Sequence, residues 1–212
     1  FDPLGNLLLE FGTNGSGNGQ FSNPKGIAIT AGGDIYVADS GNSRVQKFNS
    51  SGIYQSQFGT NGSGNGQFSG MMGMDIDSAG NIYVVDAGNY RVQKFNSSGT
   101  YVSQIGSTRG TGNNQLYNPV DVHIDASGNI YITDDSVQYV KKYNSAGVHQ
   151  MTFGSYGAGA GQFQSVFGID VDSAGNIYVA DAIHPIQVFD STGAYFATMM
   201  SRKQPIKKSC SC

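Results

Sequence analysis

The chain repeats one pattern about every 47 residues, four times over. An aromatic residue marks the same place in each repeat and is followed by a turn and a short apolar stretch, at Phe1, Phe48, Phe95, Tyr143 and Phe189. A period of this length, filled with short alternating segments, is typical of one supersecondary unit used repeatedly. The 212 residues are therefore expected to stack as similar units, and a residue needed once per unit is expected to belong to the scaffold.

Each unit is predicted to be a small sheet. Residues 24–59 contain four short runs rich in Ile, Val, Tyr and Phe, each bounded by Gly, Asn, Asp or Ser. Such runs, joined by short turns, predict four antiparallel strands. Sheets of this kind packed around an axis are the blades of a β-propeller. We therefore predict an all-β propeller with four-stranded blades at about 24–59, 71–106, 118–154 and 166–200.

The two ends of the chain do not complete a further blade. Residues 5–12 are predicted to form a lone outer strand, because they resemble the fourth strand of a blade without the three strands that precede it. Residues 201–212 form a basic tail that contains both cysteines. In an oxidising setting, Cys210 and Cys212 are expected to be able to form intermolecular disulfides.

Several residue types that attract attention are predicted to be scaffold. The Gly-rich segments 11–24 and 58–71 lack the Gly-Lys-Ser/Thr that a phosphate-binding loop needs, so they are interpreted as crossing loops between blades. One tyrosine in each second strand is expected to pack between blades: Tyr36, Tyr83, Tyr131 and Tyr178. The lysines of the third strands are expected to face solvent: Lys47, Lys94, Lys141 and Lys142.

Charge argues against a nucleic-acid partner. Residues 1–200 carry eight Lys and Arg against fifteen Asp and Glu, a net charge of −7. Binding to a nucleic-acid backbone needs clustered basic groups. The sequence contains no run of 18 apolar residues, so it predicts no transmembrane segment.

The expected location is extracellular or at the cell surface. Four Asn-x-Ser sequons support this expectation, at Asn14, Asn49, Asn61 and Asn96. The sequence also opens on Phe1 rather than on Met, as a processed or excised protein would.

The repeated motifs resemble a known family. The pattern FGxxGxGxGQFxxPxGIAIxxxGxIYVADxGNxRVQKF is similar to the NHL repeat, and the resemblance extends over residues 1–200. It implies a propeller whose blades carry Asp-x-x-Asn-x-Arg in the loop after the second strand. An Asp at a strand end and an Arg five residues later can tie such a loop with charge-assisted hydrogen bonds. This loop lock is expected at Asp39, Asn42 and Arg44 in the first blade and at Asp86, Asn89 and Arg91 in the second.

The third and fourth blades depart from this motif. Their loops begin with an Asp but lack the Asn and the Arg. They are interpreted either as relaxed scaffold or as specialised contact loops for a partner. The candidate contact residues are Asp134, Asp135, Tyr139, Asp181 and His184.

Blade number is the second departure, because NHL propellers usually close with six blades. Four blades and a lone strand leave three explanations: a fragment of a longer propeller, a ring with fewer blades, or a chain completed by another copy. Unpaired edges and uncovered blade faces favour association. The third explanation therefore predicts oligomers or filaments.

The innermost strands carry the only candidate metal site. Asp75, His123 and Asp170 hold the same position in three successive inner strands. Two carboxylates and an imidazole around a central channel could bind Ca²⁺ or Zn²⁺. The alternative is that they are solvated polar residues of the channel wall.

Taken together, the sequence predicts a non-catalytic binding or scaffold propeller that presents its blade loops to a protein or glycan partner. Two alternatives stay open: a self-assembling homo-oligomer, and a metal-dependent lyase related to the peptide-amidating lyases that resemble NHL propellers. No Ser–His–Asp or Cys–His set is apparent, so no catalytic residue is assigned.

Overall fold

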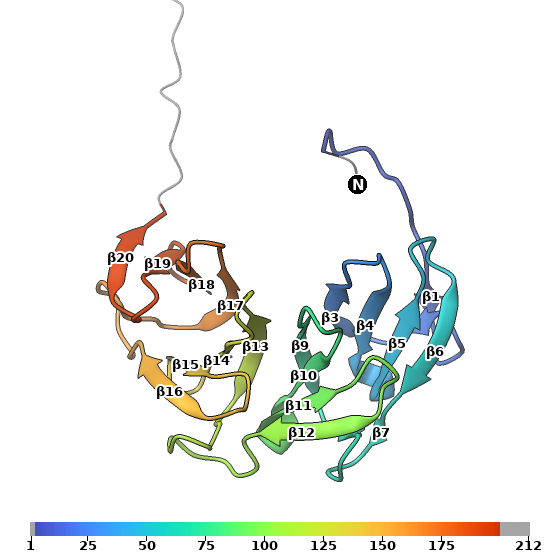
Figure 1. Ribbon diagram of the computed structural model, residues 1–212, viewed down its shortest axis with the longest axis horizontal. Helices are drawn as coiled ribbons and strands as arrows, with labels where there is room; N and C mark the ends of the chain where they lie inside the picture. The colour runs from blue at the N-terminus through green and yellow to red at the C-terminus, as the bar shows by residue number, and fades with distance from the viewer. Residues whose placement is uncertain (1–2, 200–212) are drawn as a thin grey trace, which may run out of the picture.

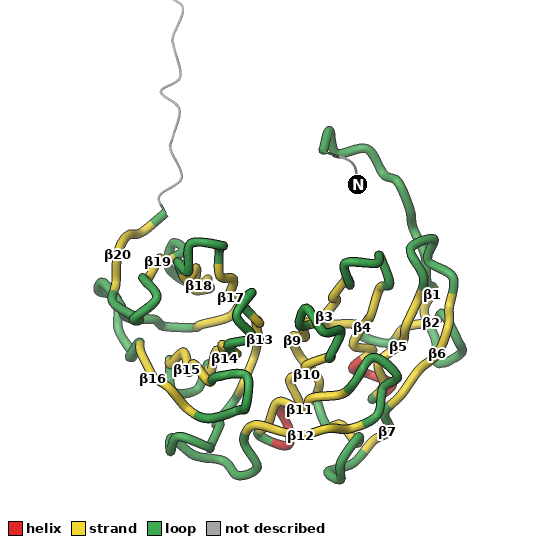
Figure 2. Tube along the Cα trace, in the orientation of Figure 1, coloured by secondary structure: helices red, strands yellow, loops and turns green. Residues whose placement is uncertain are grey.

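The computed structural model describes residues 3–199. Within that range the fold is all-β, with four four-stranded antiparallel sheets and only two short 3-10 turns as helix (Figure 2). None of the helices in residues 3–199 is long and apolar enough to cross a membrane. Cys210 and Cys212, and with them the predicted intermolecular disulfide, lie outside the described residues.

The four blades share one order of strands, from the innermost to the outermost. Blade 1 consists of β3 (Pro24–Ile29), β4 (Ile35–Asp39), β5 (Arg44–Phe48) and β6 (Tyr54–Phe58). Blade 2 consists of β9 (Met71–Ile76), β10 (Ile82–Asp86), β11 (Arg91–Phe95) and β12 (Tyr101–Ile105). Blade 3 consists of β13 (Pro119–Ile124), β14 (Ile130–Asp134), β15 (Tyr139–Tyr143) and β16 (His149–Phe153). Blade 4 consists of β17 (Val166–Val171), β18 (Ile177–Asp181), β19 (Gln187–Phe189) and β20 (Tyr195–Thr198).

The blades stand side by side in an open arc. Figure 1 shows β3, β9, β13 and β17 following one another around the centre, with β6, β12, β16 and β20 on the outside. Blades 1 and 4 form the two ends of the arc. The predicted propeller architecture is therefore confirmed, as an arc of four blades.

Short turns hold each sheet together. In blade 2, Gly80 adopts a φ of +81°, which glycine reaches without steric cost. The Asp77 carboxylate accepts hydrogen bonds from the backbone N–H groups of Ala79 and Asn81 at 3.0 and 2.8 Å. The Asp-x-x-Gly-Asn turns of blades 3 and 4 repeat this arrangement.

The hydrophobic core lies between blades. Ala28, Tyr36 and Ala38 of blade 1 pack against Met74 and Val84 of blade 2 in one buried cluster. Equivalent clusters join blade 2 to blade 3 and blade 3 to blade 4. Blades 2 and 3 thus bury one sheet face against their predecessor and the other against their successor, whereas blades 1 and 4 each have one neighbouring blade in the described chain.

The tyrosines of the second strands behave as predicted in three blades. Tyr36, Tyr83 and Tyr131 are only 2%, 2% and 1% exposed. The hydroxyls of Tyr83 and Tyr131 donate hydrogen bonds to the Asp of the neighbouring turn. Tyr178 of blade 4 is half-buried, because it lies on the face at the open end of the arc.

The Gly-rich segments are crossing loops between blades, as predicted. The first two contain short parallel ladders, formed by β1 (Thr13–Asn14) with β2 (Gln20–Phe21) and by β7 (Thr60–Asn61) with β8 (Gln67–Phe68). The other two keep one parallel bridge each at the equivalent place, Arg109 with Leu116 and Tyr156 with Phe163. The drifted sequences of the third and fourth loops therefore preserve the same backbone link.

Residues 5–12 differ from the prediction. They belong to no strand ladder within residues 3–199, because the described chain offers no third strand beside which they could pair. Phe11 nevertheless stacks on Phe48 with ring centroids 4.8 Å apart, and Phe58 stacks on Phe95 of the next blade at the same distance. The end of the segment thus takes the place of an outer strand without being one.

Candidate functional site

The candidate site is the edge of the arc that carries the loops after the second strands. We call it the lock face; it comprises loops 39–44, 86–91, 134–139 and 181–186 together with the four crossing loops. In blade 1, the loop begins at Asp39, whose side chain is fully buried. The Arg44 Nε donates to its carboxylate at 2.9 Å and the Asn42 amide donates at 2.8 Å. The structure therefore brings the three predicted lock residues together.

The lock also holds the crossing loop. The Arg44 guanidinium donates from Nη2 to the carbonyls of Gly17 and Gln20 at 2.8 and 3.0 Å. A fourth member, Gln46, donates to the same Gln20 carbonyl and to the Asp39 carboxylate. Sequence reasoning missed Gln46, although its recurrence two residues after each Arg is the signal that could have found it.

Blade 2 repeats the lock of blade 1. Arg91 Nε donates to Asp86 at 2.8 Å, and Asn89 donates to the same carboxylate at 2.9 Å. Arg91 Nη2 reaches the carbonyls of Gly64 and Gln67 at 2.7 and 2.9 Å. Two independent copies of the loop thus show the same contacts.

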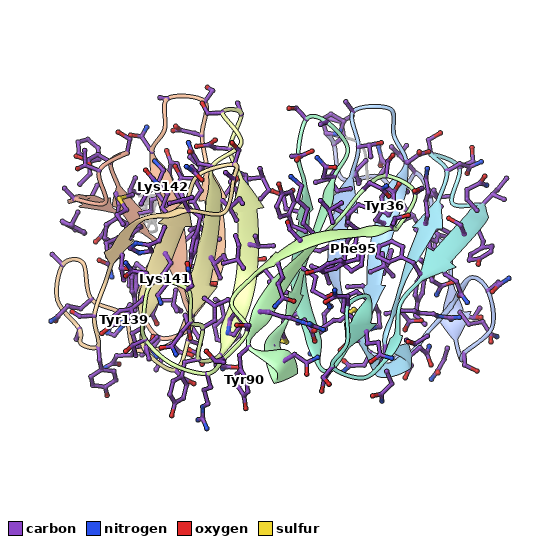
Figure 3. The ribbon with its side chains drawn as sticks, turned by 60° about the horizontal axis from the view of Figure 1, so that its bottom comes forward. Tyr36, Tyr90, Phe95, Tyr139, Lys141 and Lys142 are labelled. Atoms are coloured by element: carbon purple, nitrogen blue, oxygen red, sulfur yellow. The ribbon has the colours of Figure 1, made fainter. Side chains whose placement is uncertain are left out.

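Blade 3 replaces the arginine with a lysine from a different position. Lys141 is 1% exposed, and its ammonium donates to the carbonyls of Gly112 and Gln115 at 2.7 Å each and of Thr111 at 3.2 Å. Gly112 and Gln115 are the equivalents of the carbonyl residues that the arginines hold in blades 1 and 2. The prediction that Lys141 faces solvent is therefore wrong, because its ammonium takes over the role of the missing guanidinium (Figure 3).

The loop of blade 3 keeps the backbone of the complete locks. Gln138 has a φ of +58°, close to the +53° of Ser43 and the +57° of Tyr90 at the equivalent places. Asp134 is fully buried and accepts the N–H groups of Tyr117 and Asn118 at 2.7 and 2.8 Å. Burial raises the pKa of Asp134, while these N–H groups and the charge of Lys141 oppose the rise.

Blade 4 holds its loop without a strong cation. Asp181 accepts the N–H groups of Gln164 and Ile183 at 2.7 and 2.8 Å, and His184 Nδ1 lies 3.5 Å from the same side chain. Burial opposes ionisation of Asp181, but the N–H donors outweigh it and hold its pKa below the usual value.

The contact residues predicted in these two loops divide into two groups. Asp134 and Asp181 are 0% and 8% exposed, so they hold the loops and are not available as contact residues. Asp135, Tyr139 and His184 are half-buried and reach the surface. Of these, Asp135 accepts a hydrogen bond from Ser165 at 3.1 Å and so links blade 3 to blade 4.

The remaining lysines lie near the surface but have partners. Lys47 forms an ion pair with Asp34 at 2.8 Å, and Lys94 lies 3.7 Å from Asp77. The ammonium of Lys142 lies 5.1 Å from the centroid of the Tyr131 ring. Their stems cover the tyrosines of the blade core while their charged ends remain partly hydrated.

The inner-strand residues meet at the centre of the arc. His123 Nδ1 lies 3.5 Å from Asp75 Oδ2 and 3.3 Å from Asp170 Oδ1. Asp75 also accepts the N–H of Ile124 from the next blade at 2.7 Å, and Asp121 accepts the N–H of Ile169 at 3.2 Å. The carboxylates of these strands therefore join neighbouring blades.

The geometry does not make a metal site of this cluster. Both carboxylates approach the same imidazole nitrogen, and the Asp170 side chain is 80% exposed. Within residues 3–199, no group of three or more His, Cys, Asp or Glu side chains is arranged to hold a metal ion. The predicted donor set of Asp75, His123 and Asp170 is therefore not assembled. Burial raises the pKa of Asp75 and raises that of Asp121 to about 6.

One cluster of an exposed arginine and two half-buried tyrosines lies on the lock face. The Arg109 guanidinium lies 4.0 Å from the centroid of the Tyr117 ring and 5.9 Å from that of Tyr90. Figure 3 places Tyr90 and Tyr139 toward the same edge of the molecule, with Lys142 toward the other. Blades 2 and 3 thus share an aromatic and cationic surface on top of the locks.

Comparison with known proteins identifies the repeat. The NHL repeat family model matches residues 21–48 and 73–95. The chain is 44% identical over 48 residues to the B-box type zinc finger protein ncl-1 of Caenorhabditis elegans, covering 23% of this chain and 6% of that protein. It is 39% identical over 51 residues to Tripartite motif-containing protein 2 of Homo sapiens, covering 24% of this chain and 7% of that protein. The matches therefore span only a small part of these relatives.

Solved structures with the same fold include lyases. A streptogramin B lyase superposes with a TM-score of 0.64 at 15% identity, over 83% of this chain and 54% of that one. Virginiamycin B lyase from Staphylococcus aureus gives 0.64 at 12% identity, over 85% and 56%. Identities this low show a shared fold and nothing about activity. With the blade topology, these findings show that the chain carries NHL repeats at residues 21–48 and 73–95 and has a β-propeller fold.

Proposed function

We propose that this protein is a non-catalytic binding module that recognises a protein partner through its lock face. The observation that carries the proposal is the cluster of Arg109, Tyr117 and Tyr90. Tyrosine and arginine are enriched among the residues that dominate binding energy at protein interfaces. Arg109 is exposed and the two tyrosines are half-buried, so the cluster offers both contact area and charge.

The frame beneath the cluster supports this role. All four crossing loops keep the same parallel bridge, but the first residue of the bridged pair changes: it is Asn14 and Asn61 in the first two loops and Arg109 and Tyr156 in the last two. The backbone is thus constant while the exposed side chain varies from blade to blade. Loops fixed on a rigid scaffold lose little conformational entropy when a partner binds.

A peptide-display library panned on the full chain tests the proposal, with a glycan array run in parallel. Selected peptides should bind at least about tenfold more weakly to an Arg109→Ala variant. A Lys47→Ala variant, which removes a cation from outside the lock face, should bind them unchanged. Two results would contradict a protein partner at this cluster: selected peptides that bind the Arg109→Ala variant as tightly as the wild-type chain, or ligands found only on the glycan array.

Absence of catalysis is the second part of the proposal. Its support is that the His and Asp residues of the inner strands contact backbone N–H groups and one another, as blade-joining groups do. The enzymatic alternative is tested with streptogramin B, the compound named for one structural neighbour. Turnover that appears with the full chain after addition of Zn²⁺ or Ca²⁺ would overturn the non-catalytic assignment.

We also propose an extracellular or cell-surface location. Asn14 and Asn61, two of the sequon asparagines, are exposed on the lock face. Secretion of the chain from eukaryotic cells, followed by peptide-N-glycosidase treatment, should lower its apparent mass. An unchanged mass would remove the support that the sequons give to this location.

A further inference from the structure

Blade 1 has one sheet face that no other blade covers. Ile27 and Ile29 of this face are 60% and 62% exposed. At the place of Ile27, the other three blades bury their residues to 6%, 3% and 7% exposure: Met74, Val122 and Ile169. The difference arises because blades 2 to 4 each have a preceding blade and blade 1 has none within the described chain.

Blade 4 has the complementary uncovered face. Its Tyr178 is half-buried, whereas the equivalent tyrosines of the other blades are 1–2% exposed. The Asp170 side chain is 80% exposed, compared with 27% for its equivalent Asp75. Phe167 on the same inner strand is 44% exposed.

The chain shows three times how these two kinds of face fit together. Between blades 2 and 3, Tyr83 packs on Val122 and Ile130 while the Asp75 carboxylate accepts the N–H of Ile124 at 2.7 Å. The residues equivalent to Asp75 and Ile124 at the two ends of the arc are Asp170 and Ile29. The free faces therefore carry apolar residues at the same positions as the interfaces inside the arc, and the same acceptor–donor pair as the interface between blades 2 and 3.

We propose that blade 4 of one molecule docks on blade 1 of a second copy of this chain, head to tail. The contact continues the interface that already joins successive blades, with Asp170 accepting the N–H of Ile29 from the second copy. A head-to-tail contact closes into a ring or propagates as a filament. The free faces of blades 1 and 4 are separate from the lock face, so this proposal can be tested independently of the proposed ligand site.

The N-terminal segment marks the outer limit of the contact. An open apolar groove of about 680 Å³ separates it from the sheet of blade 1 and is lined by Leu7, Leu9, Phe21, Ile27 and Val37. The sheet of a preceding blade would fill this groove. The outer strand β20 of the docked copy would then occupy the position of Phe11, so either β20 or the segment around Phe11 must move on docking.

Sedimentation velocity of the full chain, from about 1 to about 200 μM, tests the proposal. The wild-type chain should associate as concentration rises. Ile27→Asp places a charge on the blade 1 face and should weaken association at least about tenfold. Val148→Asp is the matched control, because Val148 is 57% exposed but lies in the turn between β15 and β16 of blade 3, a blade that carries neither free face.

The opposite face is tested with Gly168→Arg. A side chain at Gly168 has room in the single chain, since the atoms nearest to its Cβ lie 3.8 Å away, but it would block a docked copy. Each variant alone retains one intact face, so mixing Ile27→Asp with Gly168→Arg should restore a dimer through the remaining pair of faces. Circular dichroism confirms that both variants are folded.

The outcomes separate cleanly. Restored dimers in the mixture support head-to-tail docking, whether the wild-type chain forms closed rings or longer assemblies. A wild-type chain that stays monomeric throughout the range would overturn the proposal. Association that neither variant weakens, or variants that do not complement each other, would also contradict it.

Discussion

Replacing Lys141 with methionine tests whether the lysine of blade 3 serves as the cation of the loop lock. Methionine keeps most of the side-chain volume and removes the charge and all three hydrogen bonds, to the carbonyls of Thr111, Gly112 and Gln115. It also removes the positive charge that lowers the pKa of the buried Asp134. The variant should therefore unfold more easily than the wild-type chain.

The magnitude follows from these contacts. A hydrogen bond made by a charged group contributes about 1.5–3 kcal/mol. Thr111 and Gly112 are exposed, so water can hydrate their carbonyls, and most of the loss comes from the less exposed carbonyl of Gln115. A loss of about 3 kcal/mol in the free energy of unfolding lowers the Tm of a domain of this size by roughly 6–12 °C.

Urea unfolding followed by circular dichroism measures the loss. Lys142→Met is the matched control, because the neighbouring ammonium contacts only the Tyr131 ring and should contribute about 0.5–1 kcal/mol. A double variant, Tyr139→Arg with Lys141→Gln, restores the Arg and the Gln of the lock in blades 1 and 2, with Val137 still in the place of their Asn, and should be more stable than Lys141→Met. The reasoning is refuted if Lys141→Met costs no more than Lys142→Met.

Two further predictions concern the channel and the crossing loops. Burial raises the pKa of Asp121 to about 6. Between about pH 4 and pH 6 the Asp121 carboxyl is therefore protonated in the folded chain and ionised in the unfolded chain. As pH rises through this window, the Asp121 carboxyl lowers the free energy of unfolding by up to about 3 kcal/mol. The difference in unfolding free energy between wild type and Asp121→Asn, measured from pH 4 to pH 7, should grow toward pH 6 and then level off; a flat difference would contradict the assignment. Gly59→Ala should lower the Tm more than Gly66→Ala. Both glycines have a positive φ, but only at Gly59 would the new Cβ clash with a ring, that of Phe68 at 2.5 Å. Equal losses of Tm would show that backbone strain, and not this clash, sets the cost of the substitution.

Most of the fold could be predicted from the sequence because each blade is a local unit. The strands of a blade are consecutive, and their turns carry the residues that the turn geometry demands, as Asp77 and Gly80 do in blade 2. The lock of the first two blades could also be predicted, because the resemblance to the NHL repeat implies it and a spacing of five residues allows Asp39 and Arg44 to pair. The spacing of residues is enough to predict a contact when the interacting side chains lie within a few residues of one another.

The repeat, the four-stranded blade and the family of the motif therefore follow from the order of the amino acids. Which cation holds each crossing loop, and which blade faces are covered, depends on how the blades pack. Lys141 reaches carbonyls that lie 26–30 residues earlier in the chain, and backbone acceptors leave no mark in residue identity. Met74 is buried because blade 1 packs against it, whereas Ile27 is exposed because no preceding blade covers it in the described chain. This difference depends on neighbours in space rather than on the type of residue.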